Sequence, residues 1–86
     1  MFENLFGDRN RISTNEMATA VQISILDTFV LVFNKTTEGD AKLHAKTAED
    51  IMHVLNHIKD IDAHVWRILK YRYKDEIKEC EELVGT

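Results

Sequence analysis

Four side chains that can bind metals recur at helical spacing in the second half of the 86-residue chain. They are His53, His57, Asp60 and His64, and at 100° per residue they fall within about 60° of one another on a helix. Two histidines four residues apart can share a zinc ion, and a carboxylate three residues further on could complete the ligand set. The metalloprotease pattern needs a glutamate directly after the first histidine, whereas Val54 stands there. We therefore interpret this histidine face as solvated, with a pH-sensitive subunit seam and a metal site as alternatives, and predict no metal or cofactor.

A second group combines aromatic rings with positive charge. Its members are Trp66, Arg67, Lys70, Tyr71, Arg72, Tyr73, Lys74 and Lys78. Such side chains can stack on a base and neutralise phosphate, and Trp, Tyr and Arg are also favoured at the centres of protein interfaces. They can equally pack along the flank of a core. Two N-terminal arginines could join them in an oligomer. The predicted ligand- or partner-binding residues are Arg9, Arg11, Trp66, Arg67, Lys70 and Tyr71.

Catalytic motifs are missing from the sequence: it has no Gly-rich phosphate loop, no nucleophile elbow and no CxxC pair. The single cysteine, Cys80, falls on an apolar helical stripe beside Glu79 and Glu81. Burial and negative neighbours both raise the pKa of a thiol and make it a poor nucleophile. We therefore expect the protein not to be an enzyme.

Composition narrows the setting of the protein. The net charge is −4 and the pI about 5.5, which disfavours a general nucleic-acid binder. One cysteine excludes an internal disulfide and favours a reducing, cytoplasmic location. No signal peptide is apparent at the N-terminus, and the most apolar run, Ala20–Phe33, is too short to cross a bilayer. These features predict a soluble protein that does not bind membranes.

The elements that position these side chains are predicted to be helices. Residues 47–84 contain no Gly or Pro and carry apolar residues at spacings of three and four. Thr47 is the expected N-cap, with Asp50 as its reciprocal residue, and Gly85 ends the helix. The whole second half of the chain is therefore predicted to form one long helix.

An earlier stretch, Glu16–Asn34, is ambiguous between helix and strand. Its β-branched residues favour a strand, but its length without breakers favours a helix, which we place at 14–34 with Ser13, Thr14 or Asn15 as the N-cap. Such a helix would be apolar on most of its circumference and hence buried. A single partner helix cannot cover that surface, so we expect a homo-oligomer.

The predicted fold is a single all-α domain. It consists of an N-terminal segment at 1–13, the buried helix at 14–34, a loop at 35–46 and the long helix at 47–84, packed as an oligomeric helical hairpin. A β-hairpin across Glu38-Gly39-Asp40 is an alternative for the loop region. The long helix would extend roughly 55 Å, about twice the length of its partner. It therefore either stays straight, which we favour, or bends back near Lys59–Asp62 into a three-helix bundle.

Residues Ile61–Tyr73 locally resemble the first part of the DNA-binding region of sigma factors and of related small phage transcriptional activators. The resemblance rests on the sequence ILKYRY at 68–73 and covers about a sixth of the chain. In that region the corresponding helix precedes a helix-turn-helix, and the resemblance implies association with nucleic acid. The recognition helix would have to follow Thr86, so specific DNA binding is not expected.

Size, lack of catalytic motifs and surplus apolar surface together favour a small non-enzymatic intracellular regulator or inhibitor that binds another macromolecule, most simply a protein. Such chains are typical of the accessory proteins of phages and mobile elements. One alternative is an oligomer that sequesters a small anionic ligand, such as a cyclic or signalling nucleotide, between subunits. A weaker alternative is a transcription-associated nucleic-acid-binding factor.

Overall fold

The computed structural model describes residues 14–85 and contains four helices over that range. They are α2 (Thr14–Lys35), α3 (Ala41–Ile61), α4 (Ala63–Arg72) and α5 (Lys74–Val84). The all-α prediction is confirmed. The strand alternatives are wrong, because 14–35 form one continuous helix and 41–45 belong to the next. The predicted N-terminal segment, 1–13, lies outside the described residues.

The first reversal of the chain, between α2 and α3, is shorter than predicted. Thr36 ends α2 by donating its backbone N–H and its Oγ1 hydroxyl to Val32 O, at 3.0 and 2.9 Å. Asp40 then caps α3 by accepting a hydrogen bond from Leu43 N at 3.0 Å. The loop is therefore residues 36–40 rather than 35–46, because a carboxylate at the N-cap satisfies the free amide groups of a helix start.

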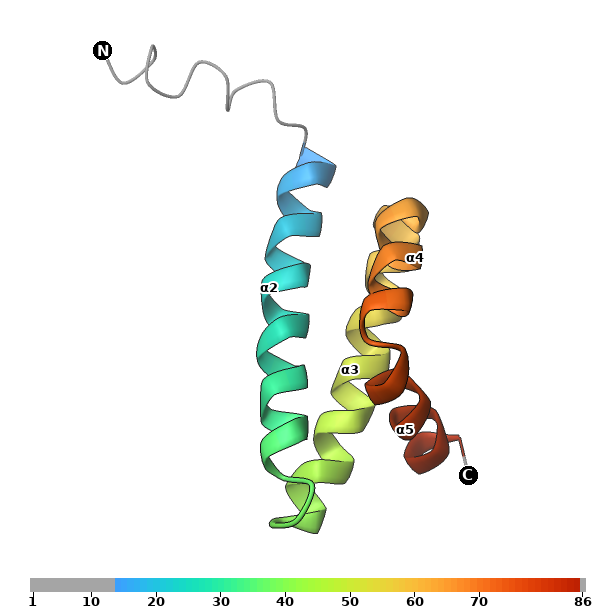
Figure 1. Cartoon of the computed structure of the whole chain (residues 1–86). Coiled ribbons are helices and arrows are strands. Elements are labelled where there is room, and N and C mark those ends of the chain that lie inside the picture. Colours follow the sequence, from blue (N-terminus) through green and yellow to red (C-terminus); the bar gives the residue numbers. More distant parts are fainter. Residues whose placement is uncertain (1–13, 86) are drawn as a thin grey trace, which may run out of the picture.

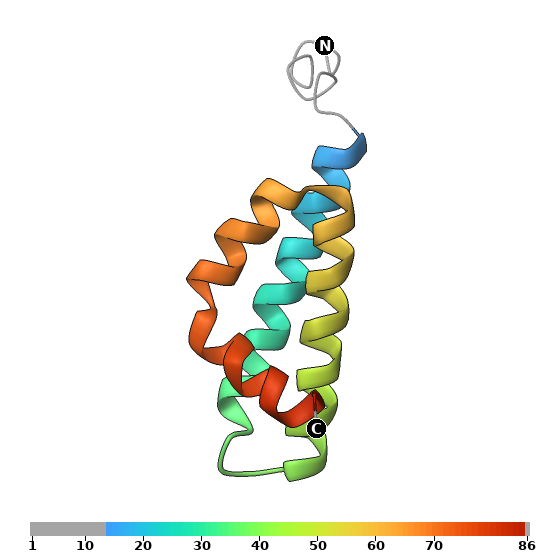
Figure 2. The same cartoon turned by 90° about the vertical axis from the view of Figure 1, so that its right-hand side faces the viewer.

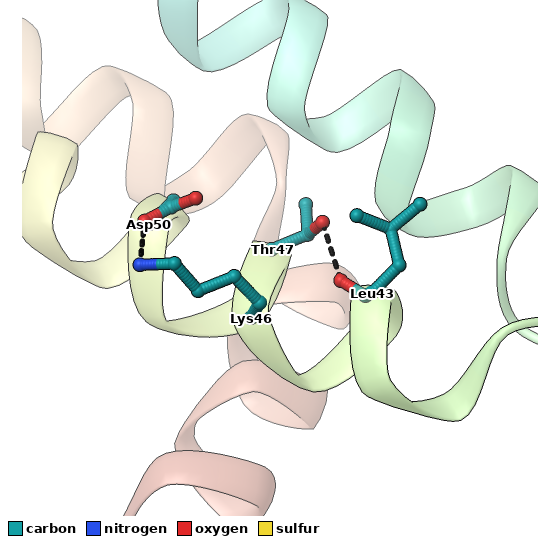
Figure 3. A network of polar contacts seen from close by, with 4 residues as sticks. All are labelled: Leu43, Lys46, Thr47 and Asp50. Atoms are coloured by element: carbon teal, nitrogen blue, oxygen red, sulfur yellow. Dashed lines mark hydrogen bonds and ion pairs between the residues drawn. The ribbon is translucent and has the colours of Figure 1, made fainter.

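Thr47 is not an N-cap, contrary to the prediction. It is buried inside α3, where its hydroxyl donates to Leu43 O at 2.7 Å, as Figure 3 shows. Asp50, its predicted reciprocal partner, instead accepts from Lys46 Nζ at 3.1 Å. A threonine within a helix commonly bonds back to the carbonyl four residues earlier, so the cap-like sequence pattern has a different use here.

The predicted long helix is broken twice. Asp62 has an extended backbone (φ −153°, ψ 94°), and its carboxylate accepts from His64 N and Val65 N at 3.1 and 3.2 Å. This cap starts α4 as a new helix, which turns back along α3 (Figures 1 and 2). A second break at Tyr73 separates α4 from α5. The preferred straight helix is therefore wrong, and the alternative bend near Lys59–Asp62 is confirmed.

All four helices contribute to one core centred on α3. The buried apolar residues are Leu26, Val30 and Phe33 of α2; Ala48, Ile51, Val54, Leu55 and Ile58 of α3; Leu69 of α4; and Ile77 and Cys80 of α5. Burying one such large aliphatic or aromatic side chain stabilises the fold by roughly 1.5–3 kcal/mol. At the loop end, Phe33 stacks on His44 with ring centroids 4.0 Å apart, and His44 Nδ1 lies 3.0 Å from Thr36 Oγ1. The core thus also holds the first reversal in place.

Within the described chain, α2 is not the fully buried helix that its composition predicts. One face packs on the core, but Met17, Val21 and Leu31 are 60%, 56% and 56% exposed. By length and composition alone, the helical stretch Glu16–Lys35 could cross a membrane. The apolar helix is therefore longer than the run Ala20–Phe33 on which the sequence prediction rested. Three side chains of this helix are buried in the core, and Ile23, Ile25 and Phe29 pack partly against it, so only part of its apolar surface faces outward.

Candidate binding surface on α4

The position of α4 is fixed at both ends and in the middle. Asp62 caps its first turn, and Leu69 is buried in the core. Just beyond its C-terminus, the hydroxyl of Tyr73 donates a hydrogen bond to the Asp27 carboxylate of α2. Burial raises the pKa of Tyr73, and the bond to Asp27 raises it further, so the hydroxyl stays protonated as a donor. The face of α4 opposite Leu69 is therefore held toward solvent.

The indole of Trp66 lies at the edge of the core and attracts two cations. Its ring packs against the buried cluster, with Lys59 Nζ of α3 4.8 Å and Lys70 Nζ of α4 4.6 Å from its centroid. Both distances suit cation–π attraction. A positive site bounded by an aromatic ring thus forms where α3 and α4 run side by side.

Next to this site, large side chains extend into solvent. Tyr71 is 77% exposed and Ile68 is 53% exposed. Arg67, one helical turn before Tyr71, is exposed, and Lys74 Nζ lies 5.4 Å from the Tyr71 ring centroid. We call Trp66, Arg67, Ile68, Lys70, Tyr71 and Lys74 the α4 surface. Residues 63–74 include four Lys or Arg and no Asp or Glu, so this surface is positive in a chain of net charge −4.

Four of the predicted binding residues lie on this surface: Trp66, Arg67, Lys70 and Tyr71. The two others, Arg9 and Arg11, lie outside the described residues. Sequence reasoning missed Lys59 and Ile68. Lys59 meets Trp66 because the chain reverses at Asp62, and no periodic pattern signals that reversal.

The predicted histidine face is divided by the same reversal. His53, His57 and Asp60 are exposed on α3, whereas His64 follows the Asp62 break on α4. Across residues 14–85, the structure places no three His, Cys, Asp or Glu side chains together as a potential metal site. The single line of ligands expected on a straight helix therefore does not form in this part of the chain.

Cys80 is fully buried on α5 and faces the core. Burial raises the pKa of its thiol to about 11, with further contributions from Glu79, Glu76 and Glu81. The reactive thiolate is therefore scarce at neutral pH, and this cysteine serves as a packing residue.

A hollow of about 460 Å³ opens on α2, lined by Ser24, Ile25, Thr28 and Phe29. None of these residues belongs to the α4 surface. No protein-family model, curated protein or solved structure matches the chain. The function must therefore be inferred from the chemistry of its own surfaces.

Proposed function

We propose that the protein is a small non-enzymatic cytoplasmic regulator that acts by binding an acidic and apolar patch of another protein through the α4 surface. The observation that carries this proposal is Tyr71, which is 77% exposed among cations on a helix fixed in place by its core contacts. Tyr, Trp and Arg side chains are the groups that most often contribute large binding energies at protein interfaces. The absence of acidic residues from 63 to 74 selects for a partner of opposite charge.

The partner should offer carboxylates around a small apolar depression. Carboxylates can pair with Arg67 and Lys70, and the depression can receive Tyr71 and Ile68. Because the cations are exposed, they should act mainly on the association rate and on salt dependence, whereas the burial of Tyr71 should slow dissociation.

Sequestration of a small nucleotide is the second candidate, supported by the two ammonium groups beside Trp66. Those groups lie within 4.8 Å of the ring centroid, so a base that stacks there has to displace at least one of them. A protein carboxylate needs no such displacement. A helix-turn-helix is also disfavoured, because only Tyr73 separates α4 from α5 and such motifs use a turn of about three or four residues.

Affinity capture from the producing cells, followed by titration of the purified partner, tests the proposal. Tyr71→Ala should weaken binding by about 2 kcal/mol, or roughly thirtyfold in Kd. Arg67→Glu should weaken binding most at low salt. Leu43→Ala and Lys42→Glu, exposed positions on α3, are the matched controls and should bind as the wild type does.

Equal affinity of the wild type, Tyr71→Ala and Arg67→Glu for every captured protein would contradict the α4 surface as a protein-binding site. A thermal-shift screen with mononucleotides and cyclic dinucleotides separates the second candidate. A rise in Tm that Arg67→Glu abolishes would favour sequestration of an anion over protein binding.

A further inference from the structure

The residues on the outward face of α2 recur at a regular spacing. Met17, Val21, Ser24, Thr28 and Leu31 follow one another at intervals of four, three, four and three residues. That is the heptad spacing by which one helix packs along another. At 100° per residue these five positions lie on the side of α2 opposite the buried Leu26, and we call them the α2 seam.

Nothing in the described chain covers the α2 seam. Figure 1 shows α3, α4 and α5 all on one side of α2, with the opposite side facing no other helix. Met17, Val21 and Leu31 are each more than half exposed, and the hollow lined by Ser24, Ile25, Thr28 and Phe29 opens beside them. The seam extends about 21 Å at 1.5 Å per residue.

We infer that the α2 seam is a dimer interface, in which α2 of a second copy of this chain packs antiparallel along it. The seam is symmetric in the way such a pairing requires. Ser24 and Thr28 lie equally far before and after Leu26, and so do Val21 and Leu31. A two-fold axis at the level of Leu26 therefore places the Val21 side chain opposite Leu31 of the partner subunit, and Ser24 opposite Thr28 of the partner subunit.

Charge and hydrogen bonding agree with this occupant. The first turn of α2 carries Glu16 and its last turn carries Lys35, so antiparallel copies place an acidic turn at the level of a basic turn at both ends. At the centre, the Thr28 hydroxyl already donates to Ser24 O at 3.0 Å. A second helix can therefore cover this hydroxyl without leaving its hydrogen unbonded. The small side chains at 24 and 28 also let the two helices approach closely.

A lipid bilayer is the competing occupant of an apolar helix, but it fits the described chain less well. Spanning a membrane would require Leu26, Val30 and Phe33 to leave the core that they form with α3. The seam itself is a narrow strip with two hydroxyl groups at its centre. A second copy uses that strip and leaves the core intact.

Sedimentation equilibrium of the full chain over a concentration series tests the inference. The expected mass is twice 10.0 kDa at the upper concentrations. Val21→Glu alone, or Val21→Glu with Leu31→Glu, should give a folded monomer. Val21→Glu with Leu31→Lys should restore the dimer, because antiparallel pairing puts the new carboxylate beside the new ammonium group. Leu43→Glu, a partly exposed leucine on α3, is the matched control and should stay dimeric.

A wild-type mass of 10.0 kDa throughout, or a dimer that survives Val21→Glu, would overturn the inference. Failure of the opposite-charge pair to restore the dimer would overturn the antiparallel arrangement. Wild-type chain that floats with phosphatidylcholine–phosphatidylglycerol vesicles instead of dimerising would overturn the dimer itself.

A cross-linking measurement does not depend on the folding of the charged variants. Val21→Cys mixed with Leu31→Cys should form the mixed disulfide in preference to either self-disulfide, because like positions would be about 15 Å apart along the axis. Preferential self-pairing of Val21→Cys would contradict the proposed register. Cys80 is buried and does not compete.

Discussion

The hydroxyl of Tyr73 donates a hydrogen bond to the carboxylate of Asp27, and this bond joins the junction of α4 and α5 to the middle of α2. The two residues are 46 positions apart in the sequence. Nearer the C-terminal end of α2, Asn34 Nδ2 donates to Glu76 Oε2 of α5 at 3.2 Å. These two contacts connect α2 to α5 and to the junction before it, whereas α4 and α5 otherwise pack mainly on α3.

Tyr73→Phe should lower the free energy of unfolding by about 0.5–1.5 kcal/mol, because it removes one hydrogen bond and keeps the packed ring. Asp27→Ala, which removes the acceptor, should cost a similar amount. Urea denaturation of the two single variants and the double variant checks this. If the pair acts as described, the double variant should lose less than the sum of the single variants. Strictly additive losses would show that the two side chains do not interact.

Asp62→Ala should destabilise the protein by about 1 kcal/mol, because two backbone amide groups at the start of α4 lose their acceptor. Asp62→Asn should retain most of the stability, since an asparagine side chain also caps helices. The neighbouring exposed carboxylate provides the control, and Asp60→Ala should change the midpoint of urea denaturation little. Equal effects at positions 60 and 62 would argue against the cap.

Ile58 and Ile68 have similar positions in the apolar pattern of the sequence but opposite positions in the fold. Ile58→Ala should cost 2–5 kcal/mol by leaving a cavity in the core, since Ile58 is fully buried. Ile68→Ala should stay within about 0.5 kcal/mol, because Ile68 is 53% exposed. Thermal unfolding of both variants would distinguish the bent chain from a straight helix, in which a single stripe would bury both residues.

The thiol of Cys80 should make the fold sensitive to alkali. Its pKa is about 11 in the folded chain and 9.0 without the fold, so its contribution is fully present below pH 9.0 and is lost as the pH rises through 11. Cys80→Ala should remove the loss of stability that the thiol causes at alkaline pH. The loss caused by the tyrosines and lysines should remain. Iodoacetamide should modify the native thiol slowly at pH 8 and the urea-unfolded thiol quickly. Rapid native modification would contradict its burial.

Several elements could be predicted from sequence because local chemistry determines them. The length of 14–34 without Gly or Pro identified a helix, and Gly85 marked the end of the last one. The aromatic and basic residues from Trp66 to Tyr71 were recognised as one group, since they follow one another within two helical turns.

Other features depend on contacts between distant residues. Asp62 resembles any polar residue of a helix face, and its role as a cap appears only when α4 packs back on α3. Thr47 was the predicted cap, but the structure begins α3 seven residues earlier, with Asp40 as its N-cap. The apolar residues of α2 could not be divided into inward and outward sets until the positions of α3 and α5 were known.

The number of buried anchors differs sharply between helices. In α4 only Leu69 is fully covered, whereas six residues of α3 are. Local opening equilibria favour segments with few such anchors, so α4 should detach and reclose far more often than α3 and exchange its amide hydrogens sooner. A partner that binds α4 in its packed position would also oppose this opening, so part of the binding free energy would appear as slower hydrogen exchange of the α4 amides.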